Sequence, residues 1–526
     1  MYCANSSTAA RRGNSEVPVS SSSAPTTRPG LIVAVLAAGG IVATLMQTLV
    51  VPLIGELPRL LGTSAGNASW VITATLLAGS AAIAAIGRLS DLLGNRRMLL
   101  ACVGSLLVGS VVCALSGSLA PMVVGRALEG VGLGVVPVGI SALRELVPPE
   151  RLGSAIALMS SSLGIGGAFG LPFAAVMAEH AGWHAVFWVA AGLSAVVAVL
   201  IWLLVPVLPP RAAGRFDAVG AVGLGFGLVC LLLAVSKGAD WGWTSGTTVG
   251  LIAVSLAVFA AWGWWELHAT DPLVNLRIAA RRQVLMTNLA SVVLGFALYA
   301  SQLILPQLLQ LPKATGYGLG QSMLAMGLWM APSGLLMLLV APFGGRLSQA
   351  RGPKVTLIAG SLIIAVGYGS SMILLSTAWG LLIVSCVCMV GVAFAYGAMP
   401  ALIVSAVPSS ETGSATSFNT LARSIGITMA SAVVGVVLTQ RTTLLGSRTV
   451  PSESGFRLGL LIGCGVAVAA ATVALAIPSR RDAPPSQEVA APVPVAAPSP
   501  EAGDPAQNRT SAASVVRPGP NAIRRA

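Results

Sequence analysis

The chain consists of long apolar runs separated by short polar stretches. A helix needs about 20 residues to cross a hydrocarbon core about 30 Å thick. Runs of about that length occur at residues 31–53, 70–87, 98–116, 121–143, 154–178, 186–207, 218–236, 247–267, 284–305, 321–343, 355–374, 378–403, 416–438 and 455–477. Backbone polar groups in lipid must find their partners within the segment, so each run is predicted to be a helix. The pattern therefore predicts fourteen membrane-spanning helices.

Composition agrees with a chain that lies mostly in lipid. Of the 526 residues, 55% are hydrophobic and only 9% are charged. A soluble chain of this length normally carries about a quarter charged residues. We therefore predict an all-α integral membrane protein that crosses the cell membrane many times.

The basic residues report topology rather than a nucleic-acid partner. The formal net charge is +13, but Lys and Arg stand singly between apolar runs and do not interleave with aromatic residues. With the N-terminus inside, alternate loops hold 13 basic residues against 6 in the opposite loops. Cytoplasmic loops are the ones enriched in Lys and Arg, so both termini are predicted to be cytoplasmic.

Both ends of the chain differ from the apolar middle. Residues 1–29 are rich in Ser, Thr and Ala, and residues 478–526 are rich in Ala and Pro. Neither composition can bury a core, so both are predicted to be disordered cytoplasmic tails.

Two sequence pairs reveal an internal duplication. The segment from Gly87 to Arg97 recurs from Gly345 at an offset of 258, with Gln349 in place of the acid of the first copy. The segment from Val147 recurs from Val407 at an offset of 260. We predict a six-helix half at 30–210, a second half at 281–477, and two additional spans with linkers at 211–280. Duplicated halves of this kind place a transport site between them.

Here the chain resembles a known family. Gly87-Arg88-Leu89-Ser90-Asp91-Leu92-Leu93-Gly94-Asn95-Arg96-Arg97 is similar to the signature loop of the major facilitator superfamily, and fourteen spans resemble its drug:proton antiporter branch. Other matching segments are Trp70-Val71-Ile72-Thr73, Arg126-Ala127-Leu128-Glu129-Gly130, Phe216-Asp217, Leu309-Gln310 and Gly316-Tyr317. The resemblance covers about residues 31–477. It implies the major facilitator fold and a secondary transporter that exports drugs or other small amphipathic molecules by proton antiport and alternating access.

The signature loop has a physical interpretation of its own. Gly87 and Gly94 allow a tight turn and close helix approach, while Asp91 can accept hydrogen bonds or pair with a cation. Arg96 and Arg97 suit anionic headgroups. Together these five residues are predicted to lock a cytoplasmic gate. Alternatively, the two arginines only set topology.

Charges inside spans cost about 2.5–3.5 kcal/mol each on insertion scales, so by default they indicate function. Three stand well inside apolar runs: Arg126, Glu129 and Arg423. Arg126 and Glu129 are i, i+3 neighbours that can pair. In one interpretation Glu129 exchanges the coupling proton and Arg126 tunes its proton affinity; in the other they are a static buried pair. The family resemblance implies Gln at position 129, so the carboxylate is a departure.

Further candidates lie in spans 1, 5 and 13. Related antiporters often carry an acid and an Asn where this chain reads Leu45-Met46-Gln47-Thr48, so a proton cannot couple through Met46. Gln47 and Thr48, together with Asn419 and Arg423 on one face of span 13, are predicted to contact substrate in the cavity. Gly166, Gly170 and Pro172 are predicted to bend span 5 or to admit another backbone.

The sequence gives no support for an enzyme. The three histidines and seven cysteines lack metal-ligand spacing, and neither a phosphate-binding loop nor a nucleophile motif occurs. We expect a monomer that works without a metal or other cofactor, with protons, a small-molecule substrate and the lipid bilayer as partners. A metabolite importer and a transporter-like membrane sensor remain alternatives.

Overall fold

The computed structural model describes residues 29–50, 53, 57–63, 65–68, 70–210, 212, 214–445 and 448–478. The first third contains α1 (Pro29–Thr48), α2 (Leu57–Leu60), α3 (Ala65–Ala68), α4 (Trp70–Leu93), α5 (Asn95–Leu115), α6 (Leu119–Gly132), α7 (Val135–Leu146), α8 (Pro149–Ala181) and α9 (Trp183–Leu204). Next come α10 (Ala218–Trp241), α11 (Gly246–His268) and α12 (Leu276–Ala279). The predicted tails lie outside the described residues except for Pro29, which begins α1, and Pro478.

The remainder contains α13 (Arg282–Gln310), η2 (Lys313–Thr315), α14 (Met323–Arg351), α15 (Pro353–Leu374), α16 (Ala378–Ala406), η3 (Ser409–Glu411), α17 (Thr412–Gln440) and α18 (Glu453–Leu475). Between α17 and α18, β1 (Thr442–Leu445) pairs antiparallel with β2 (Arg448–Pro451). The apolar pattern did not predict this short hairpin.

Within the described ranges, thirteen helical segments are long and apolar enough to cross a membrane. An all-helical membrane protein is therefore confirmed. The predicted fifth span, 154–178, lies in α8, a helix of 33 residues that does not belong to those thirteen.

The same helix pairs pack together at the two ends of the chain. In the first set, α1 contacts α8, α5 contacts both α6 and α9, and α4 contacts α6. In the second set, α13 contacts α17, α15 contacts both α16 and α18, and α14 contacts α16. We call α1–α9 the first half and α13–α18 the second half.

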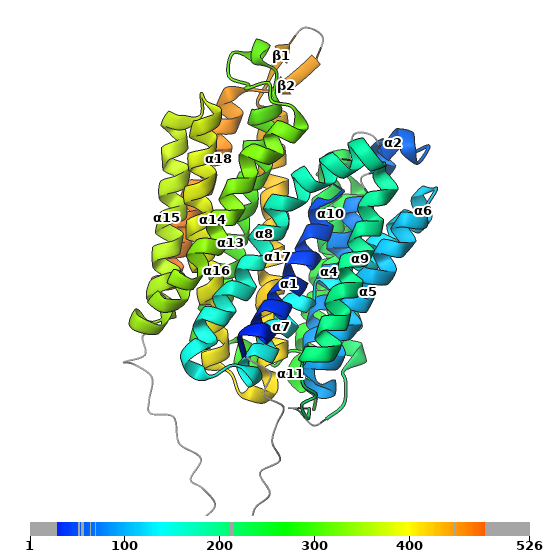
Figure 1. Ribbon diagram of the computed structural model, residues 1–526, viewed down its shortest axis with the longest axis vertical. Helices are drawn as coiled ribbons and strands as arrows, with labels where there is room; N and C mark the ends of the chain where they lie inside the picture. The colour runs from blue at the N-terminus through cyan, green and yellow to red at the C-terminus, as the bar shows by residue number, and fades with distance from the viewer. Residues whose placement is uncertain are drawn as a thin grey trace, which may run out of the picture. The chain divides into compact units, whose positions relative to one another are not determined.

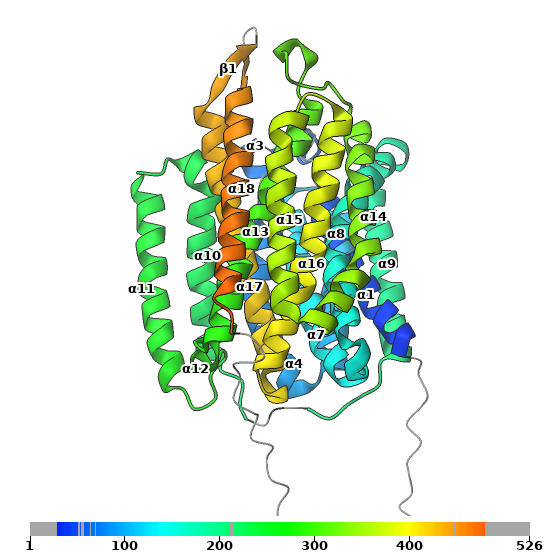
Figure 2. The ribbon, with the colours of Figure 1, turned by 90° about the vertical axis from the view of Figure 1, so that its left-hand side faces the viewer.

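The halves meet along two equivalent seams. One is formed by α4 with α17 and the other by α8 with α14. The hairpin of α10 and α11, which we call the inserted hairpin, packs beside the first of these, because α10 contacts α4 and α17; Figure 2 shows α11 outermost. Leu224 and Leu228 of α10 form an apolar cluster with Ile83, Ala84 and Leu421 of that seam.

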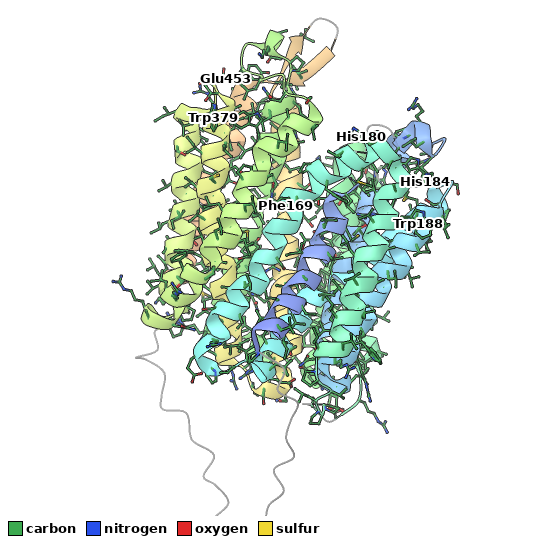
Figure 3. The ribbon with its side chains drawn as sticks, viewed as in Figure 1. Phe169, His180, His184, Trp188, Trp379 and Glu453 are labelled. Carbon is green, nitrogen blue, oxygen red and sulfur yellow. The ribbon has the colours of Figure 1, made fainter. Side chains whose placement is uncertain are left out.

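The N-terminus of α1 and the C-terminus of α18 lie at the same end of the bundle, where the chain turns from α16 into α17 (Figures 1 and 2). We call this the terminal end. Trp188 and Trp379 lie toward the opposite end in Figure 3, and their side chains are exposed. Exposed tryptophans suit the boundary between hydrocarbon and water.

Two helix boundaries differ from the predicted windows. The α4 helix runs to Leu93, so Gly87 and Asp91 lie in its last two turns and not in a loop. The apolar window ended early because it detects only the part of a helix that suits lipid. The predicted span 121–143 is divided into α6 and α7 at Leu133 and Gly134. Pro137 has no N–H to bond the carbonyl of Leu133, which breaks the helical ladder there.

Candidate functional site

The carboxylate of Asp91 joins the two halves at the terminal end. One carboxylate oxygen accepts a hydrogen bond from the Gly413 amide at 2.9 Å, and the other accepts from the Ser414 amide at 2.8 Å. These amides belong to the first turn of α17, where N–H groups have no partner within the helix. Asp91 is fully buried, and its charge also complements the positive end of the helix dipole. A side chain of the first half therefore caps a helix of the second; we call this the gate contact.

Close backbone approach accompanies the gate contact. A Cβ atom added to Gly87 would lie 2.5 Å from the Gly413 carbonyl oxygen, and one added to Gly413 would lie 2.6 Å from the Gly87 carbonyl oxygen. Real Cβ atoms do not approach so closely. The two glycines therefore allow α4 and α17 to cross at a distance that no other residue permits.

Arg144, in the last turn of α7, also contacts the second half close to the start of α17. Its guanidinium donates to the carbonyls of Val407 at 3.2 Å and Pro408 at 3.3 Å, and to the Thr412 hydroxyl. These carbonyls follow the C-terminus of α16, where a cation is favourable. In the sequence pattern Arg144 is one of the 13 basic residues that predict topology. Its place directly before the repeated Val-Pro segment was the available signal.

The second seam has an uncharged equivalent. Gln349 donates from its amide nitrogen to the Glu150 carbonyl in the first turn of α8. A Cβ added to Gly345 would lie 2.6 Å from the Cα of Ser154, so this crossing is also close. Among the described residues, the α4–α17 seam therefore has a charge-assisted contact and the α8–α14 seam has a neutral one.

The other predicted gate residues stay within the first half. Gly94 lies between α4 and α5 with a φ of +92°, a conformation that favours glycine. Arg96 donates to the Trp202 carbonyl of α9, and the exposed Arg97 forms no hydrogen bond with the described part of the chain. The structure therefore brings Gly87 and Asp91 to the seam, but not the two arginines.

Arg88 borders a cavity beside the gate contact. The cavity has a volume of about 320 Å³ and is also lined by Asp271, Asn275, Glu411 and Ser414. Arg88 is 8% exposed, and its Nε atom has no hydrogen-bond partner among the described residues. The segment that follows α11, the end of α4 and the start of α17 thus share a polar space at the terminal end.

Arg126 and Glu129 form a fully buried ion pair in α6. Ser110 of α5 donates to the second carboxylate oxygen of Glu129 at 2.7 Å. Arg126 also donates to the carbonyl of Met46 at 2.8 Å and to that of Val71 at 3.2 Å. All five residues belong to the first half.

This arrangement leaves Arg126 with acceptors whatever the charge of Glu129. The Met46 carbonyl is among the last four of α1, which have no partner within that helix. If Glu129 binds a proton, the guanidinium keeps both backbone carbonyls and the carboxyl group can still hydrogen-bond with Ser110. The site can therefore change its charge without leaving the cation unsolvated.

The glycines of span 5 contact α1. A Cβ on Gly166 would lie 2.6 Å from the Ile41 carbonyl oxygen, and one on Gly170 would lie 2.9 Å from the Cβ of Thr48. The Thr48 hydroxyl lies 3.2 Å from the Gly166 carbonyl. These contacts are those of a close approach between α8 and α1, and α8 continues as a helix through Pro172.

The four predicted cavity residues are not assembled into one site. Thr48 faces α8, and the half-buried Gln47 forms no hydrogen bond with the described residues. Asn419 donates to the side chains of Asn288 at 2.9 Å and Ser291 at 2.7 Å, both in α13.

The stem of Arg423 also lies against α13, close to Gly295, but its guanidinium contacts α16. Its guanidinium carbon lies 4.8 Å from the ring centre of Tyr396 in α16, a cation–π contact. Asn419 and Arg423 therefore line the packed interior of the second half, while Gln47 and Thr48 belong to the first.

Comparison with known proteins agrees with this architecture. A family model described as the Major Facilitator Superfamily matches residues 36–431. The tetracenomycin C resistance and export protein of Streptomyces glaucescens is 29% identical over 419 residues, which cover 79% of this chain and 77% of that protein. The multidrug resistance protein B homolog of Mycobacterium tuberculosis is 29% identical over 316 residues, 59% of this chain and 57% of the relative.

The fold is also found among solved structures. The human organic anion transporter MFSD10 (TETRAN) superposes with a TM-score of 0.59 at 16% identity, covering 85% of this chain and 99% of that one. The family match and the named relatives make this protein a membrane transporter rather than an enzyme. The chain belongs to the major facilitator superfamily.

Proposed function

We propose that this protein is a secondary active transporter that exports small amphipathic molecules, drugs among them, across the cytoplasmic membrane by proton antiport. Two relatives named for drug resistance or export support the substrate class. The terminal end is cytoplasmic in this proposal, because the alternating Lys and Arg density favours both termini inside. The protein works as a monomer with fourteen spans, including α8.

The gate contact is the observation that carries the transport cycle. Asp91 and the α17 amides hold the two halves together at the cytoplasmic end, which closes the protein on that side. Alternating access requires these bonds to break when the cytoplasmic side opens. These hydrogen bonds suit this task because they join the end of α4 to the start of α17, which belong to different halves.

Glu129 supplies the proton site in this proposal. It is a buried carboxylate, and Arg126 and Ser110 hold it in place. Movement of α1 or α4 withdraws the Met46 or Val71 carbonyl from Arg126 and so alters how strongly Arg126 favours the ionised carboxylate. Conformation and protonation are thereby coupled.

A vesicle assay tests the proposal. The full chain in inside-out membrane vesicles is offered a panel of dyes and antibiotics under a proton gradient, with and without an uncoupler. Uncoupler-sensitive accumulation supports export. Accumulation only in right-side-out vesicles indicates an importer, and the absence of flux for every compound that binds indicates a sensor.

A further inference from the structure

Seven charged side chains are buried within the described residues: Arg88, Asp91, Arg126, Glu129, Lys237, Glu266 and Arg423. Arg88 and Asp91 lie at the gate contact, and Glu266 is in the last turn of α11 near that end. Lys237 is close to the ring of Trp70 at the other end of α10. The Arg126–Glu129 pair lies in the interior of the first half, and Arg423 lies in the interior of the second half.

These last two clusters differ in charge balance. Arg126 is neutralised by Glu129 and bonded to two carbonyls, so it has little left to offer a ligand. Arg423 is 6% exposed, and no hydrogen bond or ion pair joins it to any residue that the structure describes. The face of the Tyr396 ring attracts the cation, but the ring satisfies none of its N–H donors.

Tyr396 has an unmet hydrogen bond as well. Its side chain is 1% exposed, and its hydroxyl has no partner among the described residues. Buried polar groups in native proteins are almost always hydrogen-bonded, and those that are not call for an explanation. The Tyr396 hydroxyl and the Arg423 guanidinium, which come from α16 and α17, would both gain a hydrogen-bond partner from one ligand that carries an acceptor oxygen.

The position of the pair suits a substrate. Arg423 is the twelfth residue of α17, so it lies about 16 Å along the helix from the terminal end, near the middle of a bilayer. Gly397, next to Tyr396, touches the first half, since an added Cβ would lie 2.9 Å from the Cβ of Ala157. The pair therefore lies in the second half, one residue along α16 from a contact between the halves.

We infer that Arg423 and Tyr396 form an anion-recognition site, so that the exported compounds are amphipathic molecules carrying an anionic oxygen, such as a carboxylate, rather than lipophilic cations. This inference rests on the proposed export function and names its substrate class. The guanidinium donates to the anionic oxygen, and the Tyr396 hydroxyl donates to the same or a neighbouring oxygen. A cationic drug would meet the uncompensated charge of Arg423 without a free carboxylate to balance it.

Two dyes of nearly the same shape and opposite charge test the inference. Fluorescein is anionic and rhodamine 123 is cationic on the same xanthene core. Binding to the purified full chain is measured by fluorescence polarisation, without any gradient. We expect fluorescein to bind at least about tenfold more tightly than rhodamine 123, and Arg423→Gln to weaken fluorescein binding about 10- to 100-fold.

Matched variants separate recognition from folding. Arg423→Lys keeps the charge and should retain part of the binding, while Tyr396→Phe keeps the ring and should weaken fluorescein alone. Arg457→Gln removes an exposed arginine at the start of α18 and should change nothing. The inference is wrong if fluorescein does not bind, binds equally to Arg423→Gln, or binds less tightly than rhodamine 123. If fluorescein binds through Arg423 but shows no uncoupler-sensitive flux, the proposed export function fails and the anion site stands.

Discussion

Replacing Asp91 with Asn should weaken the closed gate by an amount that the geometry allows us to estimate. The carboxylate accepts two hydrogen bonds, at 2.9 and 2.8 Å, from the amides of Gly413 and Ser414. Asn keeps one acceptor oxygen but turns an NH2 donor toward the second amide. The loss is one charge-assisted hydrogen bond, about 1.5–3 kcal/mol, and the charge at the helix terminus, about 0.3–1 kcal/mol.

The sum of about 2–4 kcal/mol corresponds to a shift of roughly 30- to 700-fold toward the state open at the terminal end. Transport should fall by at least about tenfold while membrane insertion is unchanged, because no span is altered. Spin labels on two exposed residues of the gate region, Arg97 in the first half and Ser409 in η3, report the opening by pulsed electron paramagnetic resonance. The labels require a background without native cysteines that still transports.

Gln349→Ala is the matched control at the second seam. It removes one neutral hydrogen bond, so we expect a shift of no more than about tenfold. The reasoning is refuted if Asp91→Asn leaves both the distance distribution and the transport rate at their wild-type values. It is equally refuted if Gln349→Ala opens the gate as far as Asp91→Asn does.

Three further substitutions test other parts of the structure. Glu129→Gln should abolish the pH dependence of transport, measured as initial rates in vesicles across a pH series; an unchanged pH profile and uncoupler sensitivity would make Glu129 a static partner of Arg126. Arg144→Gln should lower transport about 10-fold and open the same spin-label pair, because the carbonyls after α16 lose a cation. Gly87→Ala should abolish transport, since its Cβ would lie 2.5 Å from a carbonyl oxygen, whereas Gly104→Ala, with no atom within 4 Å of its Cβ, should transport normally.

Much of the fold followed from the sequence because lipid imposes a simple rule on composition. Apolar runs located the helices, and the repeats at Gly87 and Val147 located the segments that meet at the seams. Hydropathy does not detect polar helix ends, so the last turns of α4 were predicted as a loop. Hydropathy also does not show the effect of Pro137, which divides a predicted span into two helices.

Individual contacts were harder to predict than helices. The pairing of Arg126 with Glu129 followed from their spacing on one helix. The capping of α17 by Asp91 joins residues more than 300 positions apart, and only the fold brings them together. The role of Arg144 likewise depends on contacts that only the fold creates, and its place just before the repeated segment at Val147 was the one signal in the sequence. Asn419 and Arg423 were predicted to share a face, but helix spacing could not show that α13 satisfies one and Tyr396 faces the other.

The position of the inserted hairpin makes the two sides of the protein unequal toward the bilayer. Where α10 covers the crossing of α4 and α17, a molecule dissolved among the acyl chains meets another protein helix. Along α8 and α14 it meets exposed side chains such as Phe169, Leu335 and Leu339, and Figure 3 shows Phe169 on α8 between the two ends of the bundle. A hydrophobic compound that partitions into the membrane before transport therefore has one lateral approach to the dividing surface of the halves, and the other is shielded by the hairpin.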